Sequence, residues 1–291
     1  MLCLIGTIPL KGLPVLSGEI IKNDHNVTIG KDSFPIHRGF QSMITAAAMV
    51  CSEMGLPPPV GFTVGDIGLG DGSRKLYSYL KDNLLDIPAK IFTFHYLMPD
   101  VFWHDKLLWT IEKISEKPIL IADAGYMYVA KMSGFAPSYD LFTPDIGELA
   151  FLADEKAPHP FYTRGFILQE EHNVIPLIKR AFECENAAKI LLVKGIKDYI
   201  CAHGEITGEI DKPNVESLEP IGGTGDTLTG IVSALIHGGY PIEEASILGA
   251  KINRLAGQLA QPTPATQVSE IIKYIPSALR IVLKENEKKL S

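Results

Sequence analysis

Apolar runs about as long as a β-strand alternate with segments of helical periodicity through most of the chain. In the helical segments the apolar residues fall on one face, as Phe40, Met43 and Ala47 do in the first of them. The strands that the pattern predicts are 2–7, 60–65, 90–95, 118–122, 139–143, 189–193 and 198–203. Such an alternation is typical of βαβ units around a mostly parallel sheet, so the pattern predicts an α/β fold.

Two regions depart from this alternation. Residues 19–30 form a polar segment that we interpret as a small hairpin, serving as a lid or a subunit contact and turning at residues 24–26. Toward the end of the chain, where Pro276 is expected to interrupt the last element, the pattern predicts three consecutive helices, at about 226–238, 242–260 and 267–284. Because no internal repeat or linker separates these regions, residues 1–291 are interpreted as a single domain.

Composition and charge narrow the classes of function. Of the 291 residues, 46% are apolar and 21% are charged, which excludes a disordered or fibrous chain. The formal net charge of -7 provides no basic field for a nucleic-acid backbone, so nucleic acid is not expected as a partner. The four cysteines form no CxxC pair, which is typical of reduced thiols and of a cytoplasmic protein. The first residues hold an apolar run too short for a membrane span, so no membrane partner is expected.

A glycine-rich turn, made of Gly222, Gly223, Thr224 and Gly225, runs directly into the helix predicted from Asp226. Glycines allow successive backbone N–H groups to point into one concavity, and the positive end of the following helix adds to the attraction for an anion. Asp226 would lie beside a bound phosphate, where a carboxylate can take a proton from an attacking hydroxyl. The alternative is that Asp226 or Thr224 only caps the helix.

Five segments occur in the order found in one superfamily of enzymes. They are GDIGLG at 65–70, IADA at 121–124, TPDIGE at 143–148, VKGIKD at 193–198 and GGTGDTLTG at 222–230. The last segment resembles the GxGD signature of the ribokinase-like superfamily. As a set, the segments are most similar to the ADP-dependent NAD(P)H-hydrate dehydratase branch, over about residues 60–285.

This resemblance implies a three-layer α/β/α ribokinase-like fold with a mostly parallel central sheet. It also implies phosphoryl transfer from ADP or ATP to the hydroxyl of a small-molecule acceptor, with Asp226 as the base and the glycine-rich turn holding the transferred group. Mg²⁺ would bridge the phosphates near Glu148 and Asp145. In the dehydratase branch, the phosphorylated hydroxyl of hydrated NAD(P)H then leaves as phosphate, which restores the nicotinamide ring.

The remaining contacts that the resemblance implies each have a structural alternative. Lys194 would direct its charge at the phosphates, or it is a solvated lysine at a strand end. Glu148 would serve the metal, or it is a first-turn glutamate favoured by the helix dipole. Asp123 lies at the carboxyl edge of the sheet, where α/β proteins bind ligands, or it only forms a turn. Asp145, which stands where the family usually has histidine, and Gly68 are the other substrate-binding candidates.

Three functions stay open: an NAD(P)H-hydrate dehydratase, a sugar or vitamin-precursor kinase that releases its phosphorylated product, and a nucleotide-binding protein without turnover. Intact Asp226 and Glu148 argue against the third. A homo-oligomer is expected. The aromatic segment 95–104 is interpreted as packing rather than metal binding, and Arg164, in the loop 158–165, is a candidate contact for an anionic substrate.

Overall fold

Parallel strand pairing organises the larger part of the chain, and helix packing organises the rest. The computed structural model describes residues 1–163 and 173–290, and the chain divides into two compact units. Unit 1 comprises Met1–Leu2, Leu16–Gly61 and Ile210–Ser291, and unit 2 comprises Cys3–Val15 and Phe62–Glu209. The single domain expected from the sequence stays a prediction.

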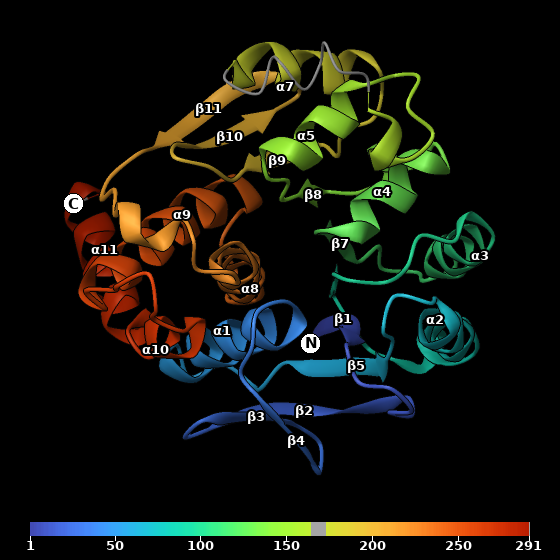
Figure 1. The fold of residues 1–291 in the computed structure, drawn as a ribbon, viewed down its shortest axis with the longest axis horizontal. Coiled ribbons are helices and arrows are strands. Elements are labelled where there is room, and N and C mark those ends of the chain that lie inside the picture. Colours follow the sequence, from blue (N-terminus) through green and yellow to red (C-terminus); the bar gives the residue numbers. More distant parts are fainter. Residues whose placement is uncertain (164–172, 291) are drawn as a thin grey trace. The chain divides into compact units, whose positions relative to one another are not determined.

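The sheet of unit 2 is mostly parallel, with helices alongside it (Figure 1). Its strands are β1 (Leu2–Ile8), β5 (Val60–Gly65), β6 (Ile91–Phe94), β7 (Ile119–Ala122), β8 (Leu141–Phe142), β9 (Ile190–Val193), β10 (Asp198–Ala202) and β11 (Glu205–Ile210). They lie in the order β11-β10-β9-β8-β7-β6-β1-β5. Strands β6 to β9 pair in parallel, whereas β9 and β10 form an antiparallel pair in which Leu192 lies opposite Ile200.

The helices of unit 2 connect these strands and bury apolar faces. They are α2 (Asp71–Asn83), α3 (Val101–Ile111), α4 (Gly125–Met132), α5 (Ile146–Ala153) and α7 (Val174–Glu183). Helices α2 and α3 lie side by side, as do α5 and α7 (Figure 1). An aromatic cluster fills part of the core, where the rings of Phe94 and Tyr126 stack with their centroids 4.3 Å apart.

Several candidate residues of unit 2 come directly after its strands. Asp66 follows β5, Asp123 follows β7, Asp145 comes soon after β8, and Lys194 follows β9. Because the carboxyl ends of parallel strands meet at one edge of a sheet, this topology gathers residues that are far apart in the sequence.

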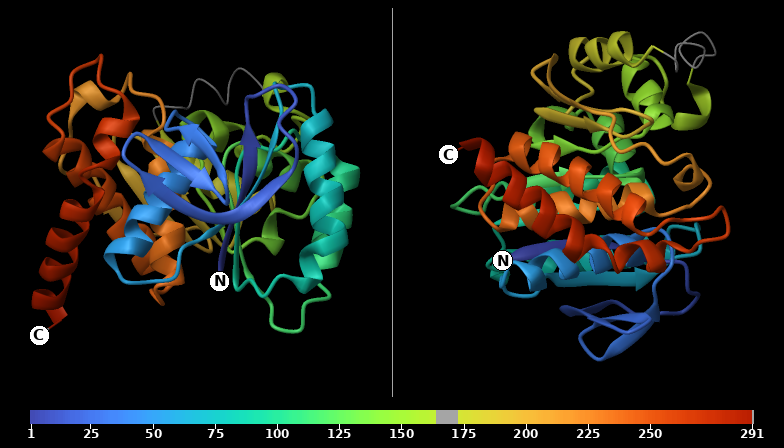
Figure 2. Two further views of the ribbon diagram at one scale, coloured as in Figure 1. Left: turned by 90° about the horizontal axis from the view of Figure 1, so that it is seen from below. Right: turned by 90° about the vertical axis from the view of Figure 1, so that its left-hand side faces the viewer.

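Unit 1 is built mainly from helices that pack against one another (Figure 2). They are α1 (Phe40–Glu53), α8 (Thr224–His237), α9 (Ile242–Leu259), α10 (Val268–Ile272) and α11 (Ile275–Leu290). Helix α1 packs on α8, and α8 packs on α9. Ile44 in α1 and Ile231 in α8 are fully buried, as expected for a shared apolar core.

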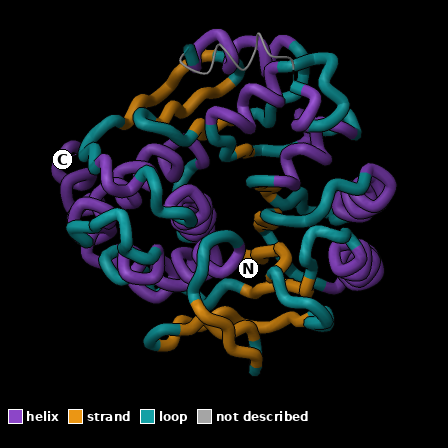
Figure 3. The backbone as a smooth tube through the Cα atoms, in the orientation of Figure 1, coloured by secondary structure: helices purple, strands orange, loops and turns teal. Residues whose placement is uncertain are grey.

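A small antiparallel sheet precedes α1 in unit 1 (Figure 3). Strands β2 (Leu16–Asn23) and β3 (Asn26–Ile29) form the predicted hairpin, with its turn at Asp24 and His25. A third strand, β4 (Asp32–Pro35), was not predicted, because it buries only Phe34 and therefore has no visible periodicity. The role of the hairpin as a lid or a subunit contact stays a prediction.

The other predicted elements match the structure well. Each predicted strand is confirmed to within two residues at either end. The break in the last helical segment falls at residues 273–274, so Pro276 lies in the first turn of α11, where its missing N–H is tolerated. The charged tail continues α11 beyond the predicted end at 284. Within the described ranges, no helix has both the length and the apolar character needed to cross a membrane, and all four cysteines are free.

Candidate functional site

The glycine-rich turn leads into α8 with Gly223 as the N-cap residue. Its φ of 109° lies in the region that favours glycine, and a Cβ there would also lie 3.0 Å from Val268 Cγ2. Thr224 and Asp226 lie inside the first turn and make no cap, so the capping alternative is wrong. The first amides of a helix have no intrahelical acceptor, which leaves this turn suited to an anion.

The carboxylate of Asp226 is held from a different helix of unit 1. The backbone N–H of Gly39, the N-cap residue of α1, donates to Asp226 Oδ2 at 2.7 Å. Ser42 Oγ lies 3.4 Å from the same oxygen and donates to the Gly39 carbonyl at 2.8 Å. Asp226 is half-buried. These contacts orient a carboxylate at the start of α8 without neutralising it.

A cavity of about 390 Å³ adjoins the glycine-rich turn in unit 1. Its walls come from the segment before α1, from the turn, and from the connection between α9 and α10. The lining residues are His37, Arg38, Pro220, Ile221, Gly222, Pro264, Thr266, Gln267 and Val268. Sequence reasoning missed His37 and Arg38, because no motif marks the segment around them.

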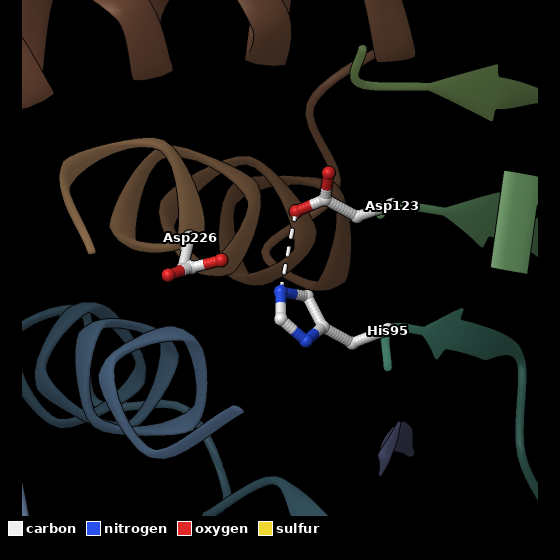
Figure 4. A group of neighbouring side chains, drawn as sticks. All are labelled: His95, Asp123 and Asp226. Carbon is white, nitrogen blue, oxygen red and sulfur yellow. Dashed lines mark ion pairs between the residues drawn. The ribbon is translucent and has the colours of Figure 1, made fainter. Parts of the chain in front are cut away.

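In unit 2, Asp123 is the centre of a buried charged group. Lys194 Nζ lies 2.7 Å from Asp123 Oδ1. On the other side of the carboxylate, His95 Nε2 lies 3.5 Å from Asp123 Oδ2, as Figure 4 shows. The side chains of His95 and Asp123 are 0% and 1% exposed, and that of Lys194 is 13% exposed. Lys194 is therefore paired with a buried carboxylate, and the solvated alternative for it is wrong. His95 belongs to this group as well, although the sequence favoured packing for its segment.

Asp145 and Glu148 form a reciprocal capping box at the start of α5. Glu148 N–H donates to Asp145 Oδ1 at 2.7 Å, and Asp145 N–H donates to Glu148 Oε2 at 2.8 Å. The backbone of Asp145 also forms a parallel bridge with Lys194. The structural alternative for Glu148, a first-turn glutamate, is thus realised in the fold.

The electrostatics of Glu148 go beyond capping. Burial raises the pKa of its carboxyl to about 8; Lys194 opposes this shift, whereas the neighbouring Asp145 and Asp123 carboxylates add to it. Burial and the same carboxylates also raise the pKa of Tyr128 far above its ordinary value. A cation bound beside Glu148 would therefore favour the ionised form of its carboxyl.

Gly68 lies in a turn that is organised around a different carboxylate. Asp66 Oδ1 accepts from the N–H groups of Gly68, Leu69 and Gly70 at 3.0, 3.0 and 3.1 Å. Burial alone would raise the pKa of Asp66, but the bonds from Ser73, Gly70 and Gly68 lower it overall. Because the Gly68 amide already has an acceptor, any substrate contact of Gly68 would use its carbonyl or Cα.

The last two candidate segments are the aromatic segment 95–104 and the loop that contains Arg164. In the segment 95–104, the buried His104 contacts Tyr139 OH at 2.9 Å and Ser133 Oγ at 3.0 Å, which fits the packing interpretation. Arg164 lies outside the described residues.

The structure thus sorts the predicted site residues into two groups. Unit 1 contains the phosphate-binding candidates of the glycine-rich turn and the base candidate Asp226. Unit 2 brings together Asp123, Asp145, Glu148 and Lys194, with Gly68 in its own turn. Their roles toward ligands stay predictions.

Comparisons with known proteins agree with the motifs. The sequence profile of the carbohydrate kinase family described as NAD(P)H-hydrate dehydratase matches residues 101–277. An uncharacterized protein of Methanocaldococcus jannaschii is 46% identical over 223 residues, covering 76% of this chain and 91% of that protein. An ADP-dependent (S)-NAD(P)H-hydrate dehydratase of Haloterrigena turkmenica is 36% identical over 102 residues, which is 34% of this chain and 38% of that enzyme.

A ribokinase-like superfamily protein of Enterococcus faecalis has a similar structure, with a TM-score of 0.56 at 16% identity, covering 97% of this chain and 87% of that one. The chain therefore has an α/β ribokinase-like fold. It belongs to the carbohydrate kinase family described as NAD(P)H-hydrate dehydratase, which confirms the resemblance drawn from the motifs.

Proposed function

We propose that this protein transfers a phosphoryl group from ADP or ATP to the hydroxyl of hydrated NAD(P)H and thereby regenerates NAD(P)H. The observation that carries this proposal is Asp226, which the Gly39 amide orients at 2.7 Å in the first turn of a helix preceded by a glycine-rich anion site. Family membership supports the reaction class. The ADP dependence of the Haloterrigena turkmenica enzyme favours ADP as the donor.

The chemistry follows from a carboxylate beside a phosphate site. The phosphoryl group moves from the terminal phosphate to the acceptor oxygen, while Asp226 takes the proton of that hydroxyl. The bond between carbon and the phosphorylated oxygen then breaks, and phosphate leaves with the bonding electrons. Loss of a proton from the adjacent carbon restores the ring double bond. The amides of Gly223, Thr224 and Gly225 would hold the transferred group.

The carboxylates of Glu148, Asp145 and Asp123 in unit 2 fit Mg²⁺, which prefers oxygen ligands. Burial and the neighbouring carboxylates keep the pKa of Glu148 raised although Lys194 opposes the shift, and this supports Glu148 as the proposed ligand with Asp145 beside it. Bound Mg²⁺ would neutralise phosphate charge. Lys194 is the proposed contact to the phosphates, and Asp123, Asp145 and Gly68 are the proposed contacts to the acceptor.

A small-molecule kinase is the second candidate. It is favoured by Asp145, an exposed carboxylate that stands where the family usually has histidine. A carboxylate is a good acceptor for the hydroxyl groups of a sugar or vitamin precursor. Such an enzyme would release a stable phosphate ester.

One assay separates the candidates. The protein is incubated with Mg²⁺, ADP or ATP, and hydrated NADH, and the recovery of reduced nicotinamide absorbance is followed together with phosphate release. Parallel reactions contain hydroxyethylthiazole, hydroxymethylpyrimidine or simple sugars. Equal amounts of NADH and phosphate support the dehydratase, whereas accumulation of a phosphate ester identifies a kinase. If no reaction occurs with any acceptor, both the dehydratase and the kinase proposals are contradicted.

A further inference from the structure

We propose that Arg38 binds the terminal phosphate of the nucleotide and holds it against the glycine-rich turn. This inference rests on the proposed function in one respect, the placement of the nucleotide phosphates at Gly222–Asp226. It adds a residue that lies 184 positions before Gly222 and that no sequence motif marks.

The first observation is the path of the Arg38 side chain. A Cβ on Gly222 would lie 2.9 Å from Arg38 Cδ and 3.5 Å from Arg38 Nη1. The guanidinium therefore lies close to the backbone of the turn, and a side chain at position 222 would require Arg38 to move. The glycine at position 222 thus allows Arg38 to lie beside the turn.

The second observation is the charge of the cavity. Arg38 and His37 are the titratable groups among the described residues that line it, and none of those lining residues is acidic. Arg38 is exposed and makes no ion pair within the described part of the chain. Arg280, also in unit 1, instead pairs with Glu53 at 2.7 Å. The charge of Arg38 is therefore available for an anionic ligand.

The third observation is the shape of the site. Its volume of about 390 Å³ lies in the range of small-molecule pockets, roughly 300–1,000 Å³. Ile221, Pro264 and Val268 offer apolar surface to a nucleoside, whereas the guanidinium lies beside the amides of the turn. A guanidinium matches phosphate through two parallel N–H···O bonds, so this end of the cavity suits a phosphate and the other end suits the nucleoside.

These observations give Arg38 a role that depends on the phosphates. Removing a charge-assisted contact of this kind typically weakens binding about 10- to 100-fold. Arg38→Gln should therefore lower the affinity for ADP by that factor and leave the affinity for adenosine, which has no phosphate, within about twofold. Arg38→Lys keeps the charge but loses the paired geometry, so its affinity for ADP should lie between those of the unmodified protein and Arg38→Gln.

The test is isothermal titration of the full chain with ADP and with adenosine, for the unmodified protein, Arg38→Gln, Arg38→Lys and the control Arg280→Gln. The control removes an arginine from the same unit but outside the cavity, and thermal unfolding checks that every variant is folded. A loss for ADP that is confined to the Arg38 variants supports the proposal.

Two results overturn it. If Arg38→Gln and the unmodified protein bind ADP with equal affinity, Arg38 does not contact the phosphate, and the proposed function is unaffected. Failure of the unmodified protein to bind ADP would contradict both the role of Arg38 and the proposed function. Conversely, Arg38-dependent ADP binding without turnover of hydrated NADH would sustain Arg38 and reject the proposed acceptor.

Discussion

The glycine-rich turn of unit 1 and the charged group of unit 2 differ in the groups that they offer to a ligand. The turn relies on backbone amides, on a half-buried Asp226 and on an exposed Arg38. The group in unit 2 relies on side-chain charges that already neutralise one another, because Lys194 lies 2.7 Å from the buried Asp123. A backbone site costs little stability when it is empty. A buried charged site is tied to the stability of the fold.

The largest expected effect comes from the single carboxylate of the turn. Asp226→Asn keeps the shape but cannot accept a proton, so kcat should fall about 10²- to 10⁴-fold while Kd for ADP stays within about threefold. Steady-state kinetics and titration measure the two quantities. Asp211→Asn, at an exposed position of the same unit, is the control. A variant with more than a third of the original kcat would show that Asp226 only shapes the turn.

The second prediction compares two lysines at opposite ends of β9. Lys194→Met removes the partner of a buried carboxylate and should lower the free energy of unfolding by about 3–5 kcal/mol. Lys189→Met breaks a pair of the same 2.7 Å length whose lysine is 56% exposed, and it should cost about 0–1 kcal/mol. Urea denaturation measures both. Equal losses of unfolding free energy in the two variants would mean that the buried ion pair contributes no more to stability than the surface pair.

The third prediction concerns the pH dependence that Glu148 gives to unit 2. Its pKa is raised from 4.5 to about 8, so the folded state holds this proton more tightly than the unfolded state. The resulting stabilisation is complete below about pH 4.5 and is lost as the pH rises through about 8.

In the presence of a chelator, the Tm of the unmodified protein should therefore fall relative to that of Glu148→Gln between pH 5 and pH 9, as differential scanning fluorimetry would show. Added Mg²⁺ should raise the Tm of the unmodified protein more at pH 9 than at pH 6, because the ligand must be ionised. Parallel Tm curves for the two proteins would refute the assignment.

The smallest expected effect is that of Ser42, a positioning residue for Asp226. Ser42→Ala removes an Oγ that lies 3.4 Å from Asp226 Oδ2 and leaves the Gly39 contact in place. The variant also loses the 2.8 Å bond from Ser42 Oγ to the carbonyl of Gly39, whose amide orients Asp226, so we expect kcat to fall about 3- to 10-fold, because a modest hydrogen bond is worth about 0.5–1.5 kcal/mol. Steady-state kinetics measures kcat, and Ser52→Ala, at the exposed end of the same helix, should leave kcat unchanged.

Much of the fold could be predicted because its signals are local. Apolar runs such as ILLV in β9 and the one-sided helices reflect burial that every residue of the element shares. The elements that were missed lack such a signal. Strand β11 alternates exposed and half-buried residues, and β4 buries a single side chain.

The sequence by itself determined the glycine-rich turn before α8 and the first-turn position of Glu148, because each depends on neighbours within a few residues, and it also determined the order of the motifs. Only the tertiary structure decided that Arg38 lies against Gly222, that Gly39 orients Asp226 across 187 positions, and that His95 and Lys194 share Asp123. These pairs form when α1 packs on α8 and when parallel strands end at one edge. Contacts of that range are set by packing rather than by local pattern, so no periodicity or spacing in the chain marks them.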